Sequence, residues 1–374
     1  MKYYIIAGES SGDLHGSNLM KAILARDASA EIRFWGGDRM AAVGGTCVRH
    51  IRDLSVMGFV EVVRHLRQVL GNIAFCKKDI LRFRPDAIIY IDFPGFNLRI
   101  AKFAYRKGFH NFYYISPQLW AWKKGRIKVM RRILDRLFCI LPFEEDFYKG
   151  NNFPQAEYVG HPLLDAIASQ ADQTSPANPT IPINDKPLIA LLPGSRRQEL
   201  ANTMPDMLRL AAQHPEYEFV IAGMSILGSE QYSRYGKLPS NVTIRYNQTY
   251  QILSEAHAAV VCSGTATLET ALFNVPQVVC YKANPVSIAI ARWFVGNRVR
   301  FISLVNLIAD CPVVKELLQQ DFNQATLDHE FNLITKDKTY RATMRDGYAD
   351  VRRILGGSGA SDRVASAVIS AIQK

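Results

Sequence analysis

The sequence contains no uninterrupted apolar run that approaches the ~20 residues needed to span a membrane. The apolar start at residues 3–7 is cut off by Glu9 before it could serve as a signal peptide. We therefore expect a cytoplasmic protein whose contact with any membrane is peripheral.

Close cysteine pairs and several catalytic signatures are also missing. The six cysteines are scattered, without the spacing of a zinc site or a redox dithiol, so buried, reduced thiols are expected. Neither a Walker A sequence nor an H-E-x-x-H or G-x-S-x-G motif occurs. The sequence thus gives no support to ATP hydrolysis or serine-hydrolase chemistry.

What is present is the composition of a folded protein of about two domains. The chain has 374 residues, 48% hydrophobic and 21% charged, and domains usually take ~100–200 residues. Its net charge of +11 lies mostly in the first half, with 25 Lys and Arg against 16 Asp and Glu through Asp165, and 20 against 18 after it. A basic half suits nucleic acid, an anionic membrane or a phosphorylated substrate. No nucleic-acid-binding module is recognisable, so we expect no nucleic acid partner.

Short apolar β-rich runs alternate with helical stretches in two successive blocks, which predicts an α/β protein with two Rossmann-like, doubly wound parallel sheets. The expected domains are residues 1–165 and 166–374, with a polar linker at about 171–186. Ligands of such sheets bind beyond the carboxyl ends of the strands, so the loops that follow strands should carry the function in a cleft between the domains. The predicted strands are near residues 3–7, 33–35, 87–91, 112–115 and 137–141, and then 188–192, 219–222, 242–244, 258–261 and 277–281.

Three carboxylates follow the first and third of these runs. Glu9 and Asp13 lie in a glycine-containing loop before a helix, whose free amides could bind an anion or a sugar. Asp92 directly follows residues 87–91 and is a candidate general base. The alternative is a helix cap, but Asn97 is better placed to cap a helix beginning near Leu98.

An aromatic loop with a basic tail follows the run at 112–115. Trp120 and Trp122 flank a single alanine, and such rings suit sugars and acyl chains, although a packed loop is an alternative. Ser116 and Gln118 belong to the same loop. Six cations come next: Lys123, Lys124, Arg126, Lys128, Arg131 and Arg132.

Two loops in the second half have the form of phosphate-binding turns. Gly194, Ser195 and Arg196 follow a strand and open a helix, with Ser195 and Gln198 in capping-box spacing. Arg196 could add a charge-assisted contact to a diphosphate. A second such turn contains Ser263, Gly264 and Thr265, and Glu269 shares a helix face with Thr265 at a distance that suits ribose hydroxyls. A plain capped helix remains the alternative for each turn, but the pair favours a nucleotide-sugar site.

In combination these segments resemble the ordered signatures of bacterial lipid-A-disaccharide synthases, over about three quarters of the chain. The matching segments are residues 8–13, 55–62, 91–94, 116–122, 141–144, 159–162, 192–196 and 263–269.

The resemblance implies a GT-B fold and an inverting glycosyltransferase. The donor would be UDP-2,3-diacylglucosamine, the acceptor 2,3-diacylglucosamine 1-phosphate, and the products a β-1,6 disaccharide 1-phosphate and UDP, without a metal or other cofactor. By position, Asp92 matches the family's candidate base, and Arg196, Glu269 and Asn306 match its UDP-binding region. The family often has a second acid where this chain has Gly95, which leaves Asp92 as the base and Glu9 or Asp13 as candidate assistants.

Acylated substrates lie in a bilayer, and one apolar helical stripe could reach it. Within residues 56–73, Val62, Leu66 and Val69 belong to a single face, flanked by cations at 67, 77, 78, 82 and 84. A core-facing stripe is the alternative. The lipid-facing interpretation predicts peripheral association with the cytoplasmic face of the inner membrane; a homo-oligomer is left open.

Two other enzymes and one non-enzyme compete with this interpretation: a peptidoglycan N-acetylglucosaminyltransferase, a UDP-N-acetylglucosamine 2-epimerase and a membrane-surface nucleotide-binding module. The tryptophan pair and residues 56–58 favour the lipid A enzyme over the other two enzymes. Release of UDP in the presence of acylated glucosamine 1-phosphate would separate the interpretations.

Overall fold

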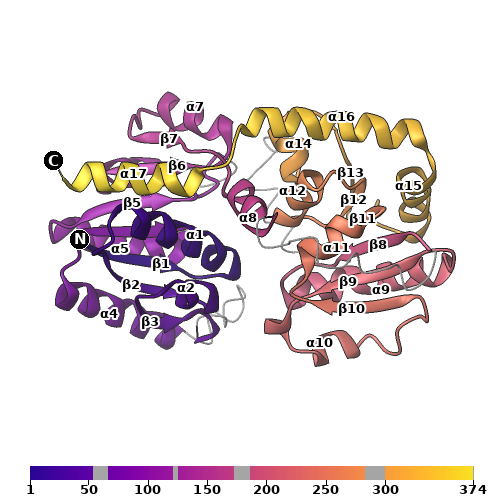
Figure 1. Ribbon diagram of the computed structural model, residues 1–374, viewed down its shortest axis with the longest axis horizontal. Helices are drawn as coiled ribbons and strands as arrows, with labels where there is room; N and C mark the ends of the chain where they lie inside the picture. Colours follow the sequence, from indigo (N-terminus) through magenta and orange to yellow (C-terminus); the bar gives the residue numbers. More distant parts are fainter. Residues whose placement is uncertain (54–65, 121–124, 172–185, 283–299, 374) are drawn as a thin grey trace. The chain divides into compact units, whose positions relative to one another are not determined.

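A computed structural model describes the chain except for residues 54–65, 121–124, 172–185, 283–299 and 374. It divides into two compact units, Met1–Ser175 with Leu355–Lys374, and Pro176–Ile354. Each unit contains one parallel sheet (Figure 1). The two doubly wound sheets that the sequence predicts are therefore confirmed.

The first unit has a sheet of order β3-β2-β1-β4-β5-β6-β7. Its strands are β1 Lys2–Ala7, β2 Glu31–Gly36, β3 Thr46–His50, β4 Ala87–Ile91, β5 His110–Tyr114, β6 Arg136–Cys139 and β7 Ala156–Tyr158. Its helices are α1 Ser10–Arg26, α2 Asp38–Val43, α4 Leu66–Phe83, α5 Pro94–Arg106, α6 Arg126–Ile133, α7 Pro142–Gly150, α8 Pro162–Ala171 and α17 Ala360–Ile372, with a 3-10 turn at Ile51–Asp53.

The second unit has a sheet of order β10-β9-β8-β11-β12-β13. Its strands are β8 Leu188–Leu192, β9 Glu218–Gly223, β10 Val242–Tyr246, β11 Ala258–Cys262, β12 Gln277–Tyr281 and β13 Lys315–Leu318. Its helices are α9 Arg197–Gln213, α10 Glu230–Ser233, α11 Thr249–Glu255, α12 Thr265–Leu272, α14 Leu304–Ala309, α15 Gln324–Lys336 and α16 Lys338–Leu355, with a 3-10 turn at Ser225–Leu227.

The ten predicted strands are all present, and three further strands were missed. The missed strands are β3, β7 and β13, each at an edge of its sheet. Edge strands are short and carry polar residues on their open side; β13, for example, is Lys-Glu-Leu-Leu. A search for apolar runs does not find such strands.

The last helix returns to the first unit, unlike the expected division at residue 165. Helix α17 packs on α1 and α8 (Figure 1), and Val364, Ala365 and Val368 join the core beside β1 and β4. The Asp165 carboxylate on α8 caps α17 by accepting hydrogen bonds from the amides of Gly359 (2.5 Å), Ala360 (3.2 Å) and Ser361 (2.8 Å). A contact between residues about 195 apart cannot be read from local sequence pattern.

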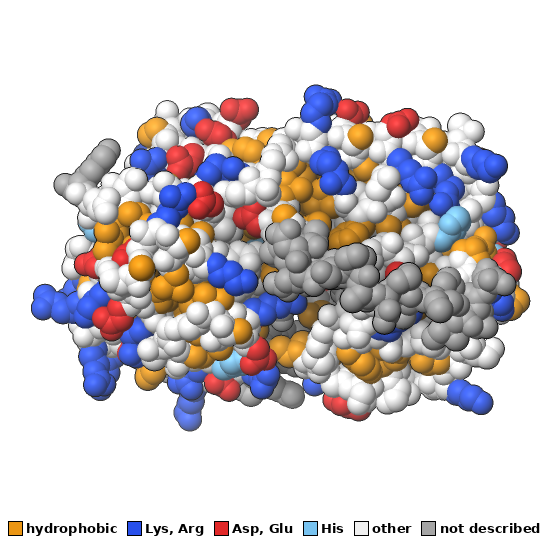
Figure 2. Space-filling model, in the orientation of Figure 1, with side chains coloured by type: hydrophobic (Ala, Val, Ile, Leu, Met, Phe, Trp, Pro, Cys, Tyr) orange, Lys and Arg blue, Asp and Glu red, His pale blue; other side chains and the backbone are white. Residues whose placement is uncertain are grey.

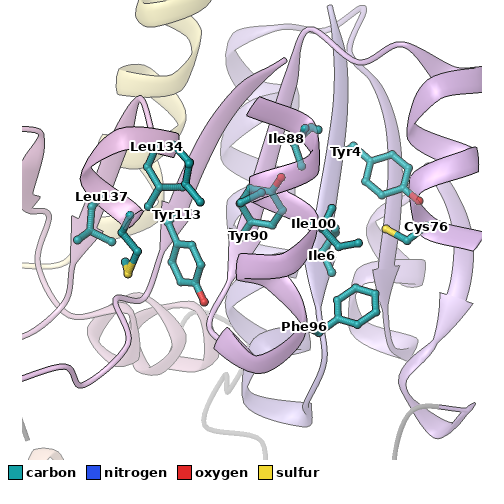
Figure 3. Packing of buried hydrophobic residues seen from close by; sticks show 14 of the residues in the cluster. Tyr4, Ile6, Cys76, Ile88, Tyr90, Phe96, Ile100, Tyr113, Leu134 and Leu137 are labelled. Atoms are coloured by element: carbon teal, nitrogen blue, oxygen red, sulfur yellow. The ribbon is translucent and has the colours of Figure 1, made fainter. Parts of the chain in front are cut away.

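Strand side chains of the first unit alternate between two apolar layers, one on each face of the sheet. Figure 3 shows part of one layer, in which Tyr4, Tyr90 and Tyr113 lie among aliphatic side chains of β4 and α5. The buried hydroxyls are hydrogen-bonded: Tyr90 donates to Asn111 Oδ1 (2.7 Å) and Tyr4 to Asp79 Oδ2 (2.9 Å). The core thus fixes the strands whose ends carry the candidate site.

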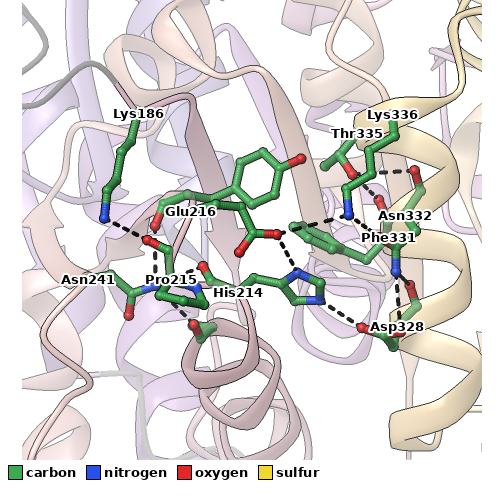
Figure 4. A network of polar contacts seen from close by, with 12 residues as sticks. Lys186, His214, Pro215, Glu216, Asn241, Asp328, Phe331, Asn332, Thr335 and Lys336 are labelled. Carbon is green, nitrogen blue, oxygen red and sulfur yellow. Dashed lines mark hydrogen bonds and ion pairs between the residues drawn. The ribbon is translucent and has the colours of Figure 1, made fainter.

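In the second unit a polar network joins the end of α9 to α15. His214 lies with Nε2 at 2.7 Å from Asp328 Oδ1 and Nδ1 at 3.1 Å from Glu216 Oε1, while its ring packs against Phe331 (Figure 4). Asn241 donates to backbone carbonyls in the same turn. Because His214 precedes β9 and Asn241 directly precedes β10, the network lies at the amino ends of these strands.

Candidate active site

Three loops of the first unit meet at the carboxyl edge of its sheet. Ala7 pairs with Ile91, and Ile91 pairs with Tyr114, so the loops after β1, β4 and β5 begin side by side. The loops after β1 and β4 also touch, because a Cβ on Gly8 would lie 2.5 Å from the Phe93 ring. The loops that carry Glu9, Asp92 and Ser116 therefore begin at the same edge of the sheet.

Asp92 is held in an unusual backbone conformation. Asp92 and Phe93 both have positive φ, 45° and 50°, and such residues cost about 1–3 kcal/mol each unless their surroundings impose them. The Asp92 carbonyl accepts hydrogen bonds from Tyr113 Oη (2.6 Å) and Asn97 Nδ2 (2.7 Å), and its amide donates to the Tyr114 carbonyl (3.0 Å). The backbone that carries this half-buried carboxylate is therefore fixed from three directions.

Asn97 does not cap the helix that follows, which corrects our expectation. Helix α5 begins at Pro94, and Asn97 is fully buried inside it. The fixed φ of proline suits the first helical position, and this places the start of the helix earlier than the apolar pattern suggests. Asn97 instead supports the Asp92 carbonyl.

Of the two candidate assistants, Asp13 has a structural role and Glu9 is exposed. The Asp13 carboxylate accepts hydrogen bonds from the amides of Gly37 (2.6 Å), Arg39 (3.1 Å) and Met40 (3.1 Å) at the start of α2. Because these three hydrogen bonds commit the carboxylate to the start of α2, the structure argues against Asp13 as a base. Glu9 immediately precedes α1, at the same sheet edge as Asp92.

The loop after β5 presents Gln118 and part of Trp120, whereas Ser116 is buried. Trp122 lies outside the described residues. The Trp120 ring meets Phe143 edge-on, with centroids 5.2 Å apart, and its Nε1 donates to Glu144 Oε1 at 3.3 Å. Glu144 belongs to the matching segment at residues 141–144, but no role was assigned to it from the sequence. Its position three residues after Leu141, with Pro142 between them, is the signal that indicates a helix-capping carboxylate.

Two loops of the second unit also lie side by side, because β8 and β11 are neighbours. Gly194 has φ 113°, and a Cβ there would lie 2.5 Å from the Glu199 side chain. Glu199 Oε2 accepts from the amides of Ser195 (2.8 Å) and Arg196 (3.2 Å). The predicted capping box of Ser195 and Gln198 is thus wrong: α9 begins at Arg197, and Glu199 is the residue that reaches back.

The second turn opens α12 and is exposed at Gly264 and Thr265. Gly264 has φ 150° with open space beside it, and Ser263 Oγ donates to the Ile302 carbonyl (3.2 Å). Glu269 is half-buried and accepts a hydrogen bond from Tyr250 Oη (2.9 Å). The turn therefore leaves room at its surface, and Tyr250 orients the carboxylate behind it.

Tyr281 is the last residue of β12, which is the neighbour of β11. Burial raises the pKa of Tyr281, Cys262 and Glu199 act in the same direction, and Arg196 opposes them. These side chains are close enough for their charges to interact across the ends of β8, β11 and β12.

Asn306, expected in the UDP region, is a buried organiser of the chain around β13. Its Oδ1 accepts from the amides of Val313 and Val314 (2.9 Å each), and its Nδ2 donates to the Val314 carbonyl (2.9 Å) and to Glu316 Oε1 (3.0 Å). Only 1% of its surface is exposed. These contacts use both of its polar atoms, which corrects the expectation of direct contact with a nucleotide.

The apolar stripe before and within α4 also needs correction. Val69 is 8% exposed and belongs to the core beneath α4, together with Ile73 and Cys76, so it does not face lipid. Val62 and the side chain of Leu66 lie outside the described residues. The exposed face of α4 carries Leu70 instead.

Among the described residues, no group of three His, Cys, Asp or Glu side chains is placed to hold a metal ion. Across the same residues, no helix is both long and apolar enough to cross a bilayer. All six cysteines are unpaired; four are buried as expected, but Cys47 and Cys311 are exposed.

Comparison with known proteins supports the same assignment. Residues 3–365 match the family model described as lipid-A-disaccharide synthetase. The chain is 34% identical to the lipid-A-disaccharide synthase of Trichlorobacter lovleyi, covering 99% of this chain and 97% of the relative. It is 37% identical to that of Acidobacterium capsulatum, covering 96% and 92%.

Solved structures that are similar confirm the GT-B fold. One is a UDP-GlcNAc 2-epimerase from Neisseria meningitidis (TM-score 0.68, 13% identity, 99% and 100% of the chains). Another is the glycotransferase of kitacinnamycin (TM-score 0.62, 14% identity, 99% and 98%). Identities this low show the fold alone, whereas the family model and the sequence relatives show that this chain belongs to the lipid-A-disaccharide synthase family.

Proposed function

We propose that this chain forms the lipid A disaccharide by a single displacement in which Asp92 is the general base. An Asp92 carboxylate oxygen takes the proton of the acceptor's 6-hydroxyl, and the oxygen of that hydroxyl attacks C1 of the donor sugar. The bond between C1 and the UDP oxygen breaks, UDP leaves, and the configuration at C1 inverts. One base is sufficient for this reaction.

The observation that carries this role is the imposed conformation of Asp92. Two consecutive positive-φ residues at a strand end, fixed by Tyr113 and Asn97, represent strain of the kind found at functional sites. Asp13, by contrast, is occupied by amides of α2. The exposed Glu9 could help orient the acceptor hydroxyl.

The leaving group is assigned to the second unit. Arg196 and the turns at Gly194 and Gly264 lie at the ends of neighbouring strands, and a cation with helix-start amides can stabilise a departing diphosphate. Glu269, held by Tyr250, is assigned to the ribose. We place no metal in this scheme.

Replacing Asp92 with Asn tests the mechanism, because Asn keeps the shape but is not a base. Turnover should fall by roughly 100-fold or more, with the affinity for UDP nearly unchanged. Near-wild-type turnover in a folded Asp92→Asn variant would remove Asp92 from the mechanism. If the wild-type protein binds UDP but releases none from the donor when acylated glucosamine 1-phosphate is present, it is a binding module.

The substrates carry acyl chains, and we propose that α4 docks peripherally on the cytoplasmic face of the inner membrane. Its exposed surface combines Leu70 (54% exposed), Phe75 (41%) and Leu81 (45%) with cations. In Figure 2, Lys and Arg side chains project from the edge of the first unit where α4 lies in Figure 1. Apolar groups among cations suit an anionic lipid surface. The cations on and beside α4 are Arg67, Lys77, Lys78, Arg82 and Arg84.

Vesicle binding tests this surface. Replacing Leu70, Phe75 and Leu81 with Ser should lower binding to vesicles containing phosphatidylglycerol and lower activity on long-chain substrates. The melting temperature should fall only slightly, through the contacts of Phe75 with Trp35 and Arg49. Ile226→Ser, at an exposed apolar residue of the second unit, is the matched control. Binding that is unaffected by the triple replacement, or by high salt, would contradict the proposal.

A further inference from the structure

Glu144 connects the end of β6 to the aromatic loop after β5. It is the third residue of α7 and is 1% exposed. Its Oε2 accepts from the amides of Ile140 (3.3 Å) and Leu141 (3.1 Å), which closes the start of the helix. Its other oxygen is thus available to a different segment.

That oxygen is used by Trp120. The indole Nε1 donates to Glu144 Oε1 at 3.3 Å, and Phe143 meets the same ring edge-on. About one turn further along α7, Tyr148 Oη donates to the Pro117 carbonyl at 2.7 Å. Helix α7 therefore holds both ends of the segment from Pro117 to Trp120, which includes the exposed Gln118.

Burying the Glu144 carboxyl costs free energy of desolvation, which capping a helix does not require. Burial raises the pKa of Glu144 to about 7, and contacts from Ser116, the two amides and Trp120 oppose that rise. Within the described part of the chain, Glu144 raises the pKa of Cys139, Tyr148 and Tyr158, none of which is a cation. A hydroxyl or amide side chain could cap α7 without burying a carboxyl. A carboxyl can accept from the backbone amides on one oxygen and from the indole on the other.

We propose that Glu144 is a positioning residue for the acceptor: through the Trp120 indole it fixes an aromatic platform on which the pyranose ring of the acylated glucosamine 1-phosphate lies. Glu144 touches no reacting atom in this role. The inference rests on the proposed function, which places the acceptor's 6-hydroxyl at Asp92, because the loop after β5 begins beside the loop that carries Asp92. Aromatic faces pack well on sugar rings, but only when the ring orientation is fixed.

Two substitutions separate the indole contact from the helix cap. Trp120→Phe removes the N–H but keeps an aromatic face, and Glu144→Gln keeps the shape but cannot accept from both the amides and the indole. Each should raise the KM for the acceptor roughly tenfold, while kcat and the KM for the donor stay within about twofold. The double variant should be no worse than the more impaired single variant, because both remove the same hydrogen bond.

Glu145→Gln is the matched control, since Glu145 is the adjacent carboxyl on α7 and bonds to Lys149 and Tyr158 rather than to Trp120. If Glu144→Gln lowers the melting temperature and impairs both substrates equally, or if Trp120→Phe behaves as wild type, the positioning role is wrong. Trp120→Ala tests the underlying assignment: an unchanged acceptor KM would mean that the loop does not hold the acceptor. A raised acceptor KM for Trp120→Ala with wild-type kinetics for Glu144→Gln would overturn only the role of Glu144.

Discussion

The ring of Phe93 lies against the backbone of Gly8 so closely that a Cβ on Gly8 would stand 2.5 Å from two of its carbons. Phe93 directly follows Asp92, and both residues have positive φ. The loop after β1 therefore limits where the loop after β4 can lie. The position of the proposed base depends on a residue that has no side chain.

Gly8→Ala should displace Phe93 and with it Asp92. Overpacking of this kind costs typically 1–3 kcal/mol, and we expect turnover to fall by about tenfold or more because the base moves. Steady-state kinetics and thermal melting check this. The double variant Gly8→Ala with Phe93→Leu, which removes the ring, should recover part of the activity; no recovery would mean that the contact does not position Asp92.

Substitutions of Asp13 and Glu9 should differ in their effect on the free energy of unfolding, because Asp13 has a structural role and Glu9 is exposed. Asp13→Ala removes the acceptor of three amides at the start of α2, so the free energy of unfolding should fall by about 1–3 kcal/mol. Glu9→Ala should lower it by less than about 1 kcal/mol, because contacts made by exposed side chains contribute little to stability. Chemical denaturation measures both. A fully stable but inactive Asp13→Ala variant would restore Asp13 as a catalytic candidate.

The interior strands and the loops after them could be predicted from sequence, because buried parallel strands are continuous apolar runs and function in this fold lies at their carboxyl ends. The predictions that failed concern residues whose hydrogen-bond partners are distant in sequence. Asp13 binds the amides of Gly37, Arg39 and Met40, which lie 24 to 27 residues further along the chain. The local sequence around such a carboxylate does not show the amides that it binds, so it was predicted to be catalytic.

Asn306 and Val69 failed for a related reason. The resemblance assigned Asn306 to the UDP-binding region. The structure shows that its side chain is hydrogen-bonded to Val313, Val314 and Glu316. For Val69, the helical pattern finds an apolar stripe but does not say whether core or lipid covers it. In the structure Val69 is buried against the core and Leu70 is exposed.

Arg196→Ala should weaken UDP binding by about 2 kcal/mol if the guanidinium contacts a phosphate. Glu199→Gln should act in the opposite direction, because it removes a negative charge beside the amides of Ser195 and Arg196, where a diphosphate would bind. Calorimetry with UDP measures both, with Glu230→Gln, at the start of α10, as the control. Equal affinity for Arg196→Ala and wild type would move the diphosphate elsewhere.

Two buried histidines should make the protein lose stability in mild acid. Burial lowers the pKa of His15 to about 4 and that of His161 to about 3. Arg39 further lowers the pKa of His15 while Asp165 opposes that shift, and His15 further lowers the pKa of His161. Between these values and the ordinary pKa of 6.5, the unfolded chain binds protons that the folded chain does not. The free energy of unfolding therefore falls as the pH drops from about 6.5 to about 4, by up to ~1.4 kcal/mol per pH unit for each histidine.

The raised pKa of Glu144 acts in the opposite sense between its ordinary value of 4.5 and about 7, so the test compares variants rather than absolute curves. His15→Leu and His161→Asn should each flatten the decline of unfolding free energy between pH 6.5 and 4 relative to wild type, as measured by urea denaturation at several pH values. A substitution at the exposed His329, His329→Asn, should leave the slope as it is. If the two buried-histidine variants keep the wild-type slope, the imidazoles of His15 and His161 are not held neutral in the folded protein, and the acid sensitivity has another source.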